Sequence, residues 1–490
     1  MPPVPGLLRA AVYTGLLVLC LVDHPSPLHS AKIVAGTEQV FYTPVGVMRL
    51  LGLRRVDPRV LTLVARLTVG FWIAAAAGLL QPVSGILAFL GFAFLHMVNA
   101  GALGANHSTH SAVYTMFALC FSVSYDFSAD RLLADHTGWP RLVSEHSVFT
   151  SGFAPLLLLC FLAYTMLAGG VAKLRYGGPR WLGGKALRFY LEQSAVAARW
   201  PWLSRQVVAR PGVCRVFAVA AVAIELSAPL AVVDSTLRMP VILSWTCLHI
   251  GILLLMMPAY WVQMCCYLLL LDWPWIASLF TGHRPDRAPV AEGGGAVALA
   301  VFGSACVLLL GYVLVRESEQ WPLTSVPMYS NGAPADAPRP PARDELHARA
   351  VRAARGRHAA WQRAWVIEEV MEDIWIRPAD GGEGRPLFLL LHEHKVAGFV
   401  RWSQYTKVVR EIAVEDVAAK PADHPEAGVE GTEYPATRFL RELAPVIRKS
   451  LPDWERYDRL ELVCRTDSGG VVIGRAQLAE QPALTGELRR

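Results

Sequence analysis

Long apolar stretches separated by short polar ones fill the first two thirds of the chain. Runs of roughly 16 to 23 apolar residues, the length that crosses the hydrocarbon core of a bilayer, begin near nine positions: Leu7, Leu61, Pro82, Ser111, Thr150, Val213, Pro240, Tyr260 and Ala296. This pattern predicts a polytopic α-helical membrane protein with about nine transmembrane helices. The first run also has features of a secretory signal peptide, but no small-residue cleavage motif follows it promptly, so we count it as a span.

The pattern changes after residue 315. Residues 316–342 begin with charged side chains and continue with many Pro and Ala residues, as in a linker. The stretch that follows starts with a helical composition and then alternates apolar and polar residues. This alternation predicts strands at Glu372–Ile376, Leu387–Leu391 and Leu460–Cys464. We therefore predict a transmembrane domain over 1–315 and a small soluble C-terminal domain, of α+β or β-rich type, over 343–490.

One part of the membrane domain has a different character. Residues 182–208 mix Trp, Leu and Phe with regularly spaced Arg and Lys, and they contain no unbroken apolar run. A sequence of this kind is typical of a segment that lies flat at the membrane surface. We expect an interfacial segment here.

Charge and cysteine content narrow the range of partners. The net charge is +6, but the basic residues gather between spans, notably at 49–59 and 175–215, which favours contact with membrane lipid over nucleic acid. The nine cysteines form neither a disulfide framework nor a zinc pattern, so no metal is predicted. The richness in Ala, Arg, Gly and Pro is typical of a GC-rich genome, so we expect a bacterial plasma (inner) membrane.

Polar side chains inside apolar spans are costly in lipid and normally face an internal cavity or a partner. His96 and Asn99 are three residues apart and share a helix face, and His107 and His110 do the same. Polar faces should therefore point inward on at least two helices. The full set is His96, Asn99, Asn106, His107, His110, Asp126, Lys173, Glu225, His249 and Asp272.

Each of these residues has a structural interpretation beside a functional one. His107 could cap a helix or bond to a neighbouring helix, or it could bind a metal together with His110, although a convincing metal site needs further ligands. Lys173 stands near the end of its span, where a lysine can extend to the lipid headgroups. Periodicity does not decide between these alternatives.

Three blocks of sequence, in order along the chain, resemble the vitamin K-dependent gamma-carboxylase family, whose membrane core is also called the HTTM domain. The first block is ANHSTHSAVYTMFAL at 105–119, followed by FSADRL at 127–132. The second is AGGVAKL at 168–174 with Trp181-Leu-x-Gly, and the third is Glu225-Leu with His249 in a later span. The resemblance covers about residues 7–315, and WPLTSVPMYS at 321–330 is similar to a segment after the last span of shorter members.

The resemblance implies an activity and a set of site residues. In the family, the lysine that matches Lys173 is the general base on a reduced naphthoquinone, whose reaction with oxygen gives an epoxide and a strong base that allows CO2 to add to a glutamyl side chain. Lys173 and His107 are then the implied catalytic residues. The implied cofactors are vitamin K hydroquinone or menaquinol, O2 and CO2. The implied substrate-binding residues are Asn106, Glu225, His249 and Trp181.

The sequence is also compatible with other functions. The chain has far fewer residues after residue 315 than the animal carboxylases, which use a longer C-terminal region to hold a protein substrate, so the acceptor is a peptide or small molecule that the sequence does not identify. The alternatives are a non-catalytic membrane scaffold or a quinone- or lipid-binding protein whose C-terminal domain binds a partner. A transporter ranks below these because no inverted repeat is visible. Charge counting places the C-terminal domain in the cytoplasm, whereas the resemblance places it outside.

Overall fold

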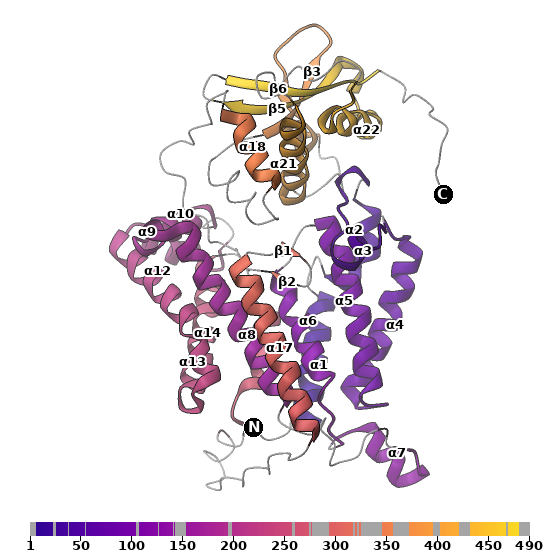
Figure 1. Ribbon diagram of the computed structural model, residues 1–490, viewed down its shortest axis with the longest axis vertical. Coiled ribbons are helices and arrows are strands. Elements are labelled where there is room, and N and C mark those ends of the chain that lie inside the picture. Colours follow the sequence, from indigo (N-terminus) through magenta and orange to yellow (C-terminus); the bar gives the residue numbers. More distant parts are fainter. Residues whose placement is uncertain are drawn as a thin grey trace. The chain divides into compact units, whose positions relative to one another are not determined.

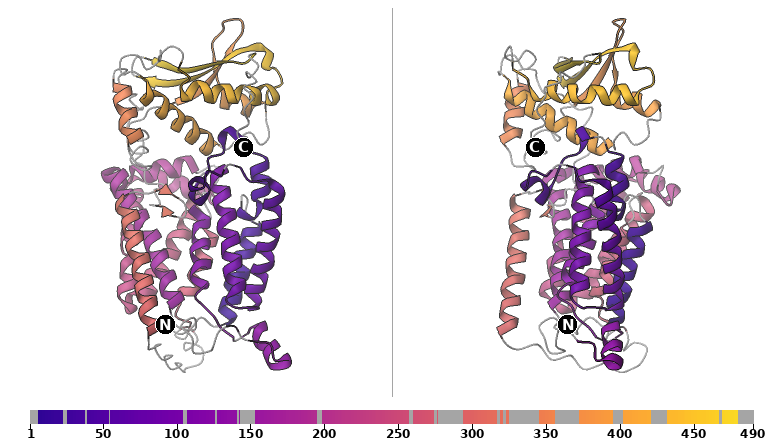
Figure 2. Two further views of the ribbon diagram at one scale, coloured as in Figure 1. Left: turned by 45° about the vertical axis from the view of Figure 1, so that its right-hand side comes forward. Right: turned by 90° about the vertical axis from the view of Figure 1, so that its right-hand side faces the viewer.

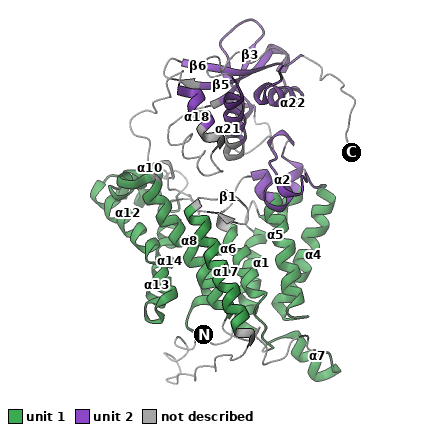
Figure 3. Ribbon diagram, viewed as in Figure 1, with its two compact units in different colours: residues 1–31, 57–98, 106–333 green, residues 32–56, 99–105, 334–490 purple. Residues whose placement is uncertain are grey.

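The computed structural model describes most of the chain and divides it into two compact units. Unit 1 comprises residues 1–31, 57–98 and 106–333, and unit 2 comprises residues 32–56, 99–105 and 334–490 (Figure 3). The described residues are 6–22, 26–37, 39–53, 55–103, 107–125, 127–140, 142, 153–194, 198–256, 260–273, 276, 294–316, 319–320, 323–324, 345–355, 372–394, 402–420, 432–466 and 469–479.

Unit 1 is a bundle of helices (Figures 1 and 2). Six helices among the described residues are long and apolar enough to cross a bilayer. They are α4 (Pro58–Ala77), α5 (Val83–Leu103), α8 (Phe153–Ala172) with the start of the following turn, α12 (Pro211–Leu226) with α13 (Ala228–Val233), α14 (Ser235–Leu255) and α17 (Gly294–Arg316). The protein is therefore a multi-pass membrane protein.

The predicted number of nine spans is not confirmed. Within the described residues a seventh span is possible if α1 (Gly6–Val22) is joined to η1 (Pro27–His29) and α2 (Ser30–Ala35), with a bend of 49°. The runs that begin near Ser111 and Tyr260 form shorter helices. Helix α6 (His107–Leu119) has 13 residues, and α15 (Trp261–Tyr267) has 7 residues before the 3-residue turn η5 (Leu268–Leu270). At about 1.5 Å per residue, neither covers the roughly 30 Å of a hydrocarbon core.

Helix α8 is the most enclosed of the six spans. In its apolar window 72% of the residues are buried, compared with 11% for α17. It packs against α6, α12, α13 and α17. A helix surrounded in this way can present polar side chains to the interior of the bundle without exposing them to lipid.

A polar network joins the start of α1 to the segment before α5. Arg9 is buried, and its guanidinium donates to Gln81 Oε1 at 2.7 Å and to the carbonyl oxygens of Ser124 and Phe127. Asp130, on α7 (Ala129–Thr137), accepts from the backbone N–H groups of residues 80 and 81 at 2.7 and 2.9 Å. The FSADRL block at 127–132 thus has a structural role in this chain, since its aspartate completes the backbone hydrogen bonds of a buried turn.

The segment predicted to be interfacial, residues 182–208, forms two short helices among its described residues, α10 (Lys185–Ser194) and α11 (Pro201–Val208). Helix α9 (Gly178–Leu182) ends at the first residue of this segment. In Figure 1, α10 lies across the ends of the longer helices of its unit. Leu191 and Val207 pack with Cys214 and Met256 in a small apolar cluster, while Trp202 is 63% exposed. The position of this segment at a membrane surface stays a prediction.

Unit 2 is built around an antiparallel sheet with strand order β4-β3-β5-β6. The strands are β3 (Glu372–Pro378), β4 (Arg385–Pro386), β5 (Tyr457–Thr466) and β6 (Gly469–Gln477). The helices are α18 (Glu345–Arg355), α20 (Leu387–Glu393), α21 (Trp402–Ala419), α22 (Pro435–Ser450) and the short η6 (Trp454–Arg456). A separate pair of two-residue strands, β1 (Glu319–Gln320) and β2 (Leu323–Thr324), belongs to unit 1.

The strands predicted at 372–376 and 460–464 are confirmed, whereas the strand predicted at Leu387–Leu391 is wrong. That run forms helix α20. Leu387, Leu390 and Leu391 are its buried residues, and their spacing is that of one face of a helix. A continuous apolar run without β-branched residues carries no alternation that would favour a strand.

The two faces of the main sheet differ sharply. Ile374, Ile376 and Leu460 belong to the apolar core that the helices of unit 2 complete. The residues next to them in sequence, Arg377 and Glu461, project from the opposite face, because side chains alternate along a strand. One face is therefore buried by helices and the other is polar.

The core of unit 2 includes a residue from near the N-terminus of the chain. The segment 32–56 contains η2 (Gln39–Phe41) and α3 (Gly46–Leu50), and it belongs to unit 2 although it lies within the membrane domain predicted over 1–315. Phe41 is fully buried, and its ring centroid lies 5.7 Å from that of Tyr405 and 5.8 Å from that of Phe439. Unit 2 thus needs the loop between α2 and α4 to complete its core.

Phe41→Ala should destabilise unit 2, although residue 41 is distant in sequence from the C-terminal sheet. Removing a buried phenylalanine costs roughly 3–5 kcal/mol, so amide hydrogen exchange in α21 and α22 should become faster. Val47→Ala in the same segment is the matched control, because Val47 is 51% exposed. Unchanged exchange in α21 and α22 of the Phe41 variant would show that the C-terminal region is stable without this segment.

Candidate functional site

Lys173 stands where helix α8 changes its geometry. The α-helix ends at Ala172, and the chain continues as one π-helical turn, η4 (Lys173–Gly177). Such turns are rare and occur frequently at functional sites. The side chain of Lys173 is 10% exposed. This burial is that of an internal residue and not of a lysine that extends to the lipid headgroups.

Glu225 is the ion-pair partner of Lys173. Its Oε1 lies 2.6 Å from Lys173 Nζ, and its side chain is also 10% exposed. Glu225 belongs to the last turn of α12, a helix that packs directly on α8. The predicted catalytic lysine and a predicted substrate-binding glutamate are therefore one hydrogen-bonded pair.

Two glycines of α8 lie against this pair, and the second is tightly packed. A Cβ atom at Gly169 would lie 3.4 Å from Glu225 Oε1 and 3.7 Å from Lys173 Nζ. A Cβ atom at Gly170 would lie 3.0 Å from Glu225 Cβ and 3.1 Å from Leu226 Cδ2. Small residues at a helix interface allow two backbones to approach closely. The AGGVAKL sequence thus combines the helix contact and the lysine in one segment.

Trp181 supplies a second contact to the lysine. Its ring centroid lies 5.4 Å from Lys173 Nζ, within the range of a cation–π interaction. Trp181 belongs to the short helix α9 and is 3% exposed. Trp181 is one of the predicted substrate-binding residues, and the structure brings it to the Lys173–Glu225 pair.

His249 belongs to a neighbouring group of polar side chains from α14 and α15. Its Nδ1 lies 2.9 Å from the carbonyl oxygen of Trp245 and 3.3 Å from Tyr267 Oη. Gln263 Nε2 donates to Tyr267 Oη at 3.0 Å. A proton on Nδ1 of His249 would satisfy the carbonyl and leave Nε2 as an acceptor.

Tyr267 and Gln263 were not among the residues predicted from the sequence. Both are buried, at 2% and 4% exposed. The signal for them is a glutamine inside an apolar run with a tyrosine four residues later, because this spacing places both on one helix face. Neither residue is charged at neutral pH, so the rule that charges within spans mark functional sites does not identify them.

Two polar atoms at the ion pair lack a protein partner. Among the described residues, Glu225 Oε2 and Trp181 Nε1 are buried and have no hydrogen-bond partner. Buried polar groups are nearly always hydrogen-bonded, so each such atom calls for an explanation. One spare acceptor and one spare donor beside Lys173 fit a site that binds a polar ligand.

The predicted histidines of α5 and α6 form a separate group. The ring centroids of His96 and His110 lie 4.6 Å apart, and both residues are buried. Tyr114 lies on the same side of α6, with its ring centroid 6.2 Å from that of His110. Polar faces of α5 and α6 do meet inside the bundle.

Two predicted site residues cannot be placed at Lys173. Helix α6 begins at His107, but the side chain of this histidine lies outside the described part of the structure, and so does the whole of Asn106. Their roles as catalytic and substrate-binding residues stay predictions. The site that the structure assembles consists of Lys173, Glu225 and Trp181, with His249 nearby.

We compared the chain with protein-family models, with curated proteins and with solved structures, and found no match in any of the three.

Proposed function

We propose that this protein is an integral membrane enzyme that oxygenates a reduced naphthoquinone to its epoxide, with Lys173 as general base. The buried Lys173–Glu225 pair is the observation that carries this proposal. We further propose that the membrane domain is HTTM-like and includes the short helices α6 and α15, and that the membrane is a bacterial inner membrane, where menaquinol would be the quinol at hand.

A gain in folding stability does not explain why a buried ion pair is present here. Removing two charges from water is costly, and well-packed apolar residues in place of a buried ion pair are often as stable or more stable. Ionisable residues within spans are accordingly rare and commonly mark functional sites. The close contact of the two helices at the pair also favours a glycine at residue 170 of α8, and glycine lowers helix propensity. A catalytic role accounts for these costs.

The residues at the pair fit a quinol. A reduced naphthoquinone has an aromatic ring and two hydroxyl groups, which need few polar partners. Glu225 Oε2 offers an acceptor and Trp181 Nε1 a donor, and the indole of Trp181 offers an aromatic surface. An apolar quinol tail would partition into the surrounding lipid. A site among membrane helices is therefore accessible to this class of molecule.

The proton shared between Lys173 and Glu225 determines when the lysine can act. With the proton on Glu225, Lys173 is a neutral amine that can accept a proton from a quinol hydroxyl. Once it becomes an ammonium, a Glu225 carboxylate and the Trp181 ring would stabilise its charge. When bound, the quinol would supply the reaction with O2 that yields the epoxide and a strong base. His249 and Tyr267 could carry protons to and from this region.

Coupling of this reaction to CO2 addition is the second part of the proposal, with a peptide or small-molecule acceptor. His107 and Asn106 enter through the resemblance, as residues that hydrogen-bond the quinol oxygen. The alternative function is a scaffold, or a protein that binds quinone or lipid without turning it over.

Lys173→Ala should abolish quinol oxygenation, and added free amine should restore part of it. Loss of a general base typically lowers the rate by about 10²- to 10⁴-fold, and a small amine can occupy the space left by the side chain. The measurement is epoxide formation from reduced naphthoquinone and oxygen by protein purified in lipid nanodiscs. Lys185→Ala is the matched control, because Lys185 is exposed on α10.

The outcomes of this experiment are distinct. Amine-dependent recovery would identify Lys173 as the base and would show that the variant is folded. Absence of turnover by the wild-type protein, with naphthoquinone binding that the substitution leaves unchanged, would contradict the proposal and favour the binding or scaffold alternative.

Glu225→Gln should lower the rate without loss of quinol binding. The amide is nearly isosteric with the carboxylate but cannot take the proton of Lys173 or balance its charge. We expect a drop in kcat of roughly 10²-fold or more with a small change in KM, measured in the same epoxide assay. Glu192→Gln is the control, because Glu192 is a half-exposed partner of Arg188 on α10. Equal kcat values in the two variants would exclude a role for Glu225 in proton transfer.

A further inference from the structure

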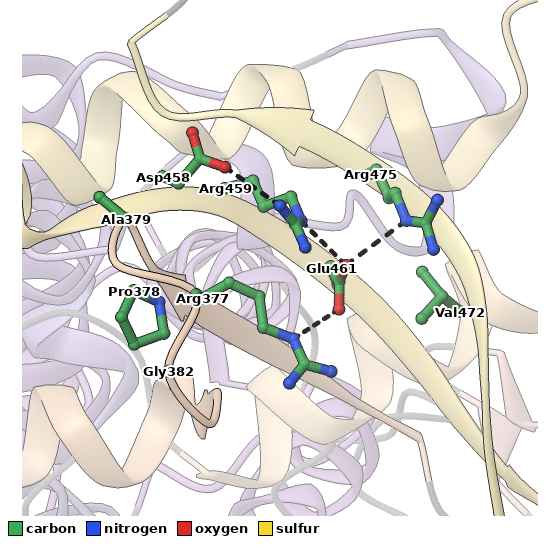
Figure 4. Close-up of a pocket in the computed structure, with 10 residues that line it drawn as sticks. Arg377, Pro378, Ala379, Gly382, Asp458, Arg459, Glu461, Val472 and Arg475 are labelled. Atoms are coloured by element: carbon green, nitrogen blue, oxygen red, sulfur yellow. Dashed lines mark hydrogen bonds and ion pairs between the residues drawn. The ribbon is translucent and has the colours of Figure 1, made fainter.

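The polar face of the sheet in unit 2 carries a cluster of three arginines around one carboxylate (Figure 4). Glu461 lies at its centre on β5, with Arg377 Nε at 2.7 Å, Arg459 Nε at 3.1 Å and Arg475 Nε at 3.4 Å. The strand register explains the arrangement, because Arg377 pairs with Arg459 across β3 and β5, and Glu461 pairs with Arg475 across β5 and β6. Each of the three arginines comes from a different strand.

The cluster contains more arginines than carboxylates. Elsewhere in this unit Arg385 pairs with Glu393 and Arg441 with Glu433, one arginine to one carboxylate. In the cluster, three arginines meet Glu461, and one neighbouring carboxylate, Asp458, accepts from Arg459 at 3.1 Å. The cluster therefore has a net charge of +1 with all groups ionised.

Glu461 is the buried member of the cluster, and the arginines around it are more exposed. Its side chain is 3% exposed, whereas that of Arg377 is 30% and that of Arg475 is 67% exposed. Burial by itself would raise the pKa of Glu461, but the hydrogen bonds and charges of Arg377 and Arg459 outweigh it and hold the pKa below its ordinary value. Glu461 thus stays ionised at neutral pH. It accepts from the Nε–H groups of Arg377 and Arg459 and forms an ion pair with Arg475, while Nη1 of Arg459 donates to Asp458.

A pocket of about 340 Å³ lies beside the cluster. The loop after β3, from Pro378 to Gly382, forms one wall, and Val472 of β6 contributes to another. Gly384 leaves room for the arginine of β3, since a Cβ atom there would lie 2.6 Å from Arg377 Cδ. Among the described residues, the Nη atoms of Arg377 and Arg475 have no carboxylate partner, so these donors can serve a ligand at the pocket.

We propose that this pocket binds a phosphate group through the Nη donors of Arg377 and Arg475, with the charge of Arg459 beside them. A phosphate group presents several acceptor oxygens to donors from different directions, and guanidinium groups match phosphate geometry in charge and shape. A carboxylate has only two oxygens and needs one guanidinium fork. The bearer of the phosphate is a soluble phosphate ester or the headgroup of an anionic phospholipid, and the two sources are separated by experiment.

Protection of individual arginines from phenylglyoxal tests the proposal on the whole protein. Full-length protein in phosphatidylcholine nanodiscs is labelled with or without inorganic phosphate, at ionic strength balanced with sodium chloride, and each arginine is quantified by peptide mass spectrometry. Phosphate should slow the labelling of Arg377 and Arg475 several-fold and leave Arg385 and Arg441 unchanged. The last two are internal controls, because each is about half exposed and ion-paired.

Nanodiscs that contain phosphatidylglycerol, without added phosphate, form the second arm. Protection in this arm assigns the phosphate to a lipid headgroup, and protection by inorganic phosphate alone assigns it to a soluble ligand. Lack of protection in both arms, or equal protection of Arg385, overturns the proposal.

Arg475→Gln provides an independent measurement. It removes one cationic donor from an exposed position, so the phosphate concentration that half-protects Arg377 should rise roughly tenfold, which corresponds to about 1.4 kcal/mol. Arg385→Gln should leave that concentration unchanged. An Arg475 variant with wild-type protection of Arg377 would show that the cluster is only a cross-strand ion network.

Discussion

The ion pair between Lys173 and Glu225 is the constraint on which the membrane domain depends. Two charged groups inside a bundle of apolar helices are tolerated only if they are matched and held at hydrogen-bond distance. Here the distance between Nζ and Oε1 is 2.6 Å. This match fixes the rotation of α8 and α12 about their axes, because both side chains must face the same internal point. It also fixes which residues of α8 lie against α12.

The glycine at residue 170 follows from the same constraint. A side chain at residue 170 would push against Glu225 Cβ and Leu226, and the helices would separate. A wider spacing would leave the ammonium and the carboxylate too far apart to compensate each other's loss of hydration. The π-helical turn at Lys173 then redirects the chain towards α9, which brings Trp181 over the ammonium. Helix packing, backbone geometry and electrostatics thus depend on one another at this site.

Much of the membrane architecture could be predicted from the sequence, because hydropathy reports directly on burial in lipid. Lys173, Glu225 and His249 were identifiable because charge within an apolar run is conspicuous. Helix lengths were less predictable, since a hydropathy window counts apolar residues and does not detect where a helix ends. The strand predicted at Leu387–Leu391 failed for a similar reason, because a short apolar run fits a buried helix as well as a strand. The burial of Phe41 in unit 2 is a long-range tertiary contact that no local pattern encodes.

The pairing of Lys173 with Glu225 also refines the chemistry that the sequence resemblance implied. A lysine without a charged partner in a site that excludes water would be neutral because burial disfavours the ammonium form, and the neutral amine could act as a base. A lysine that shares a proton with a buried carboxylate has a second way to reach the neutral state, through transfer of that proton across 2.6 Å. The transfer removes both charges at once, so its cost falls as water is excluded from the site. In the function proposed above, a quinol bound beside Glu225 would exclude water and so favour the proton arrangement in which Lys173 acts as the base.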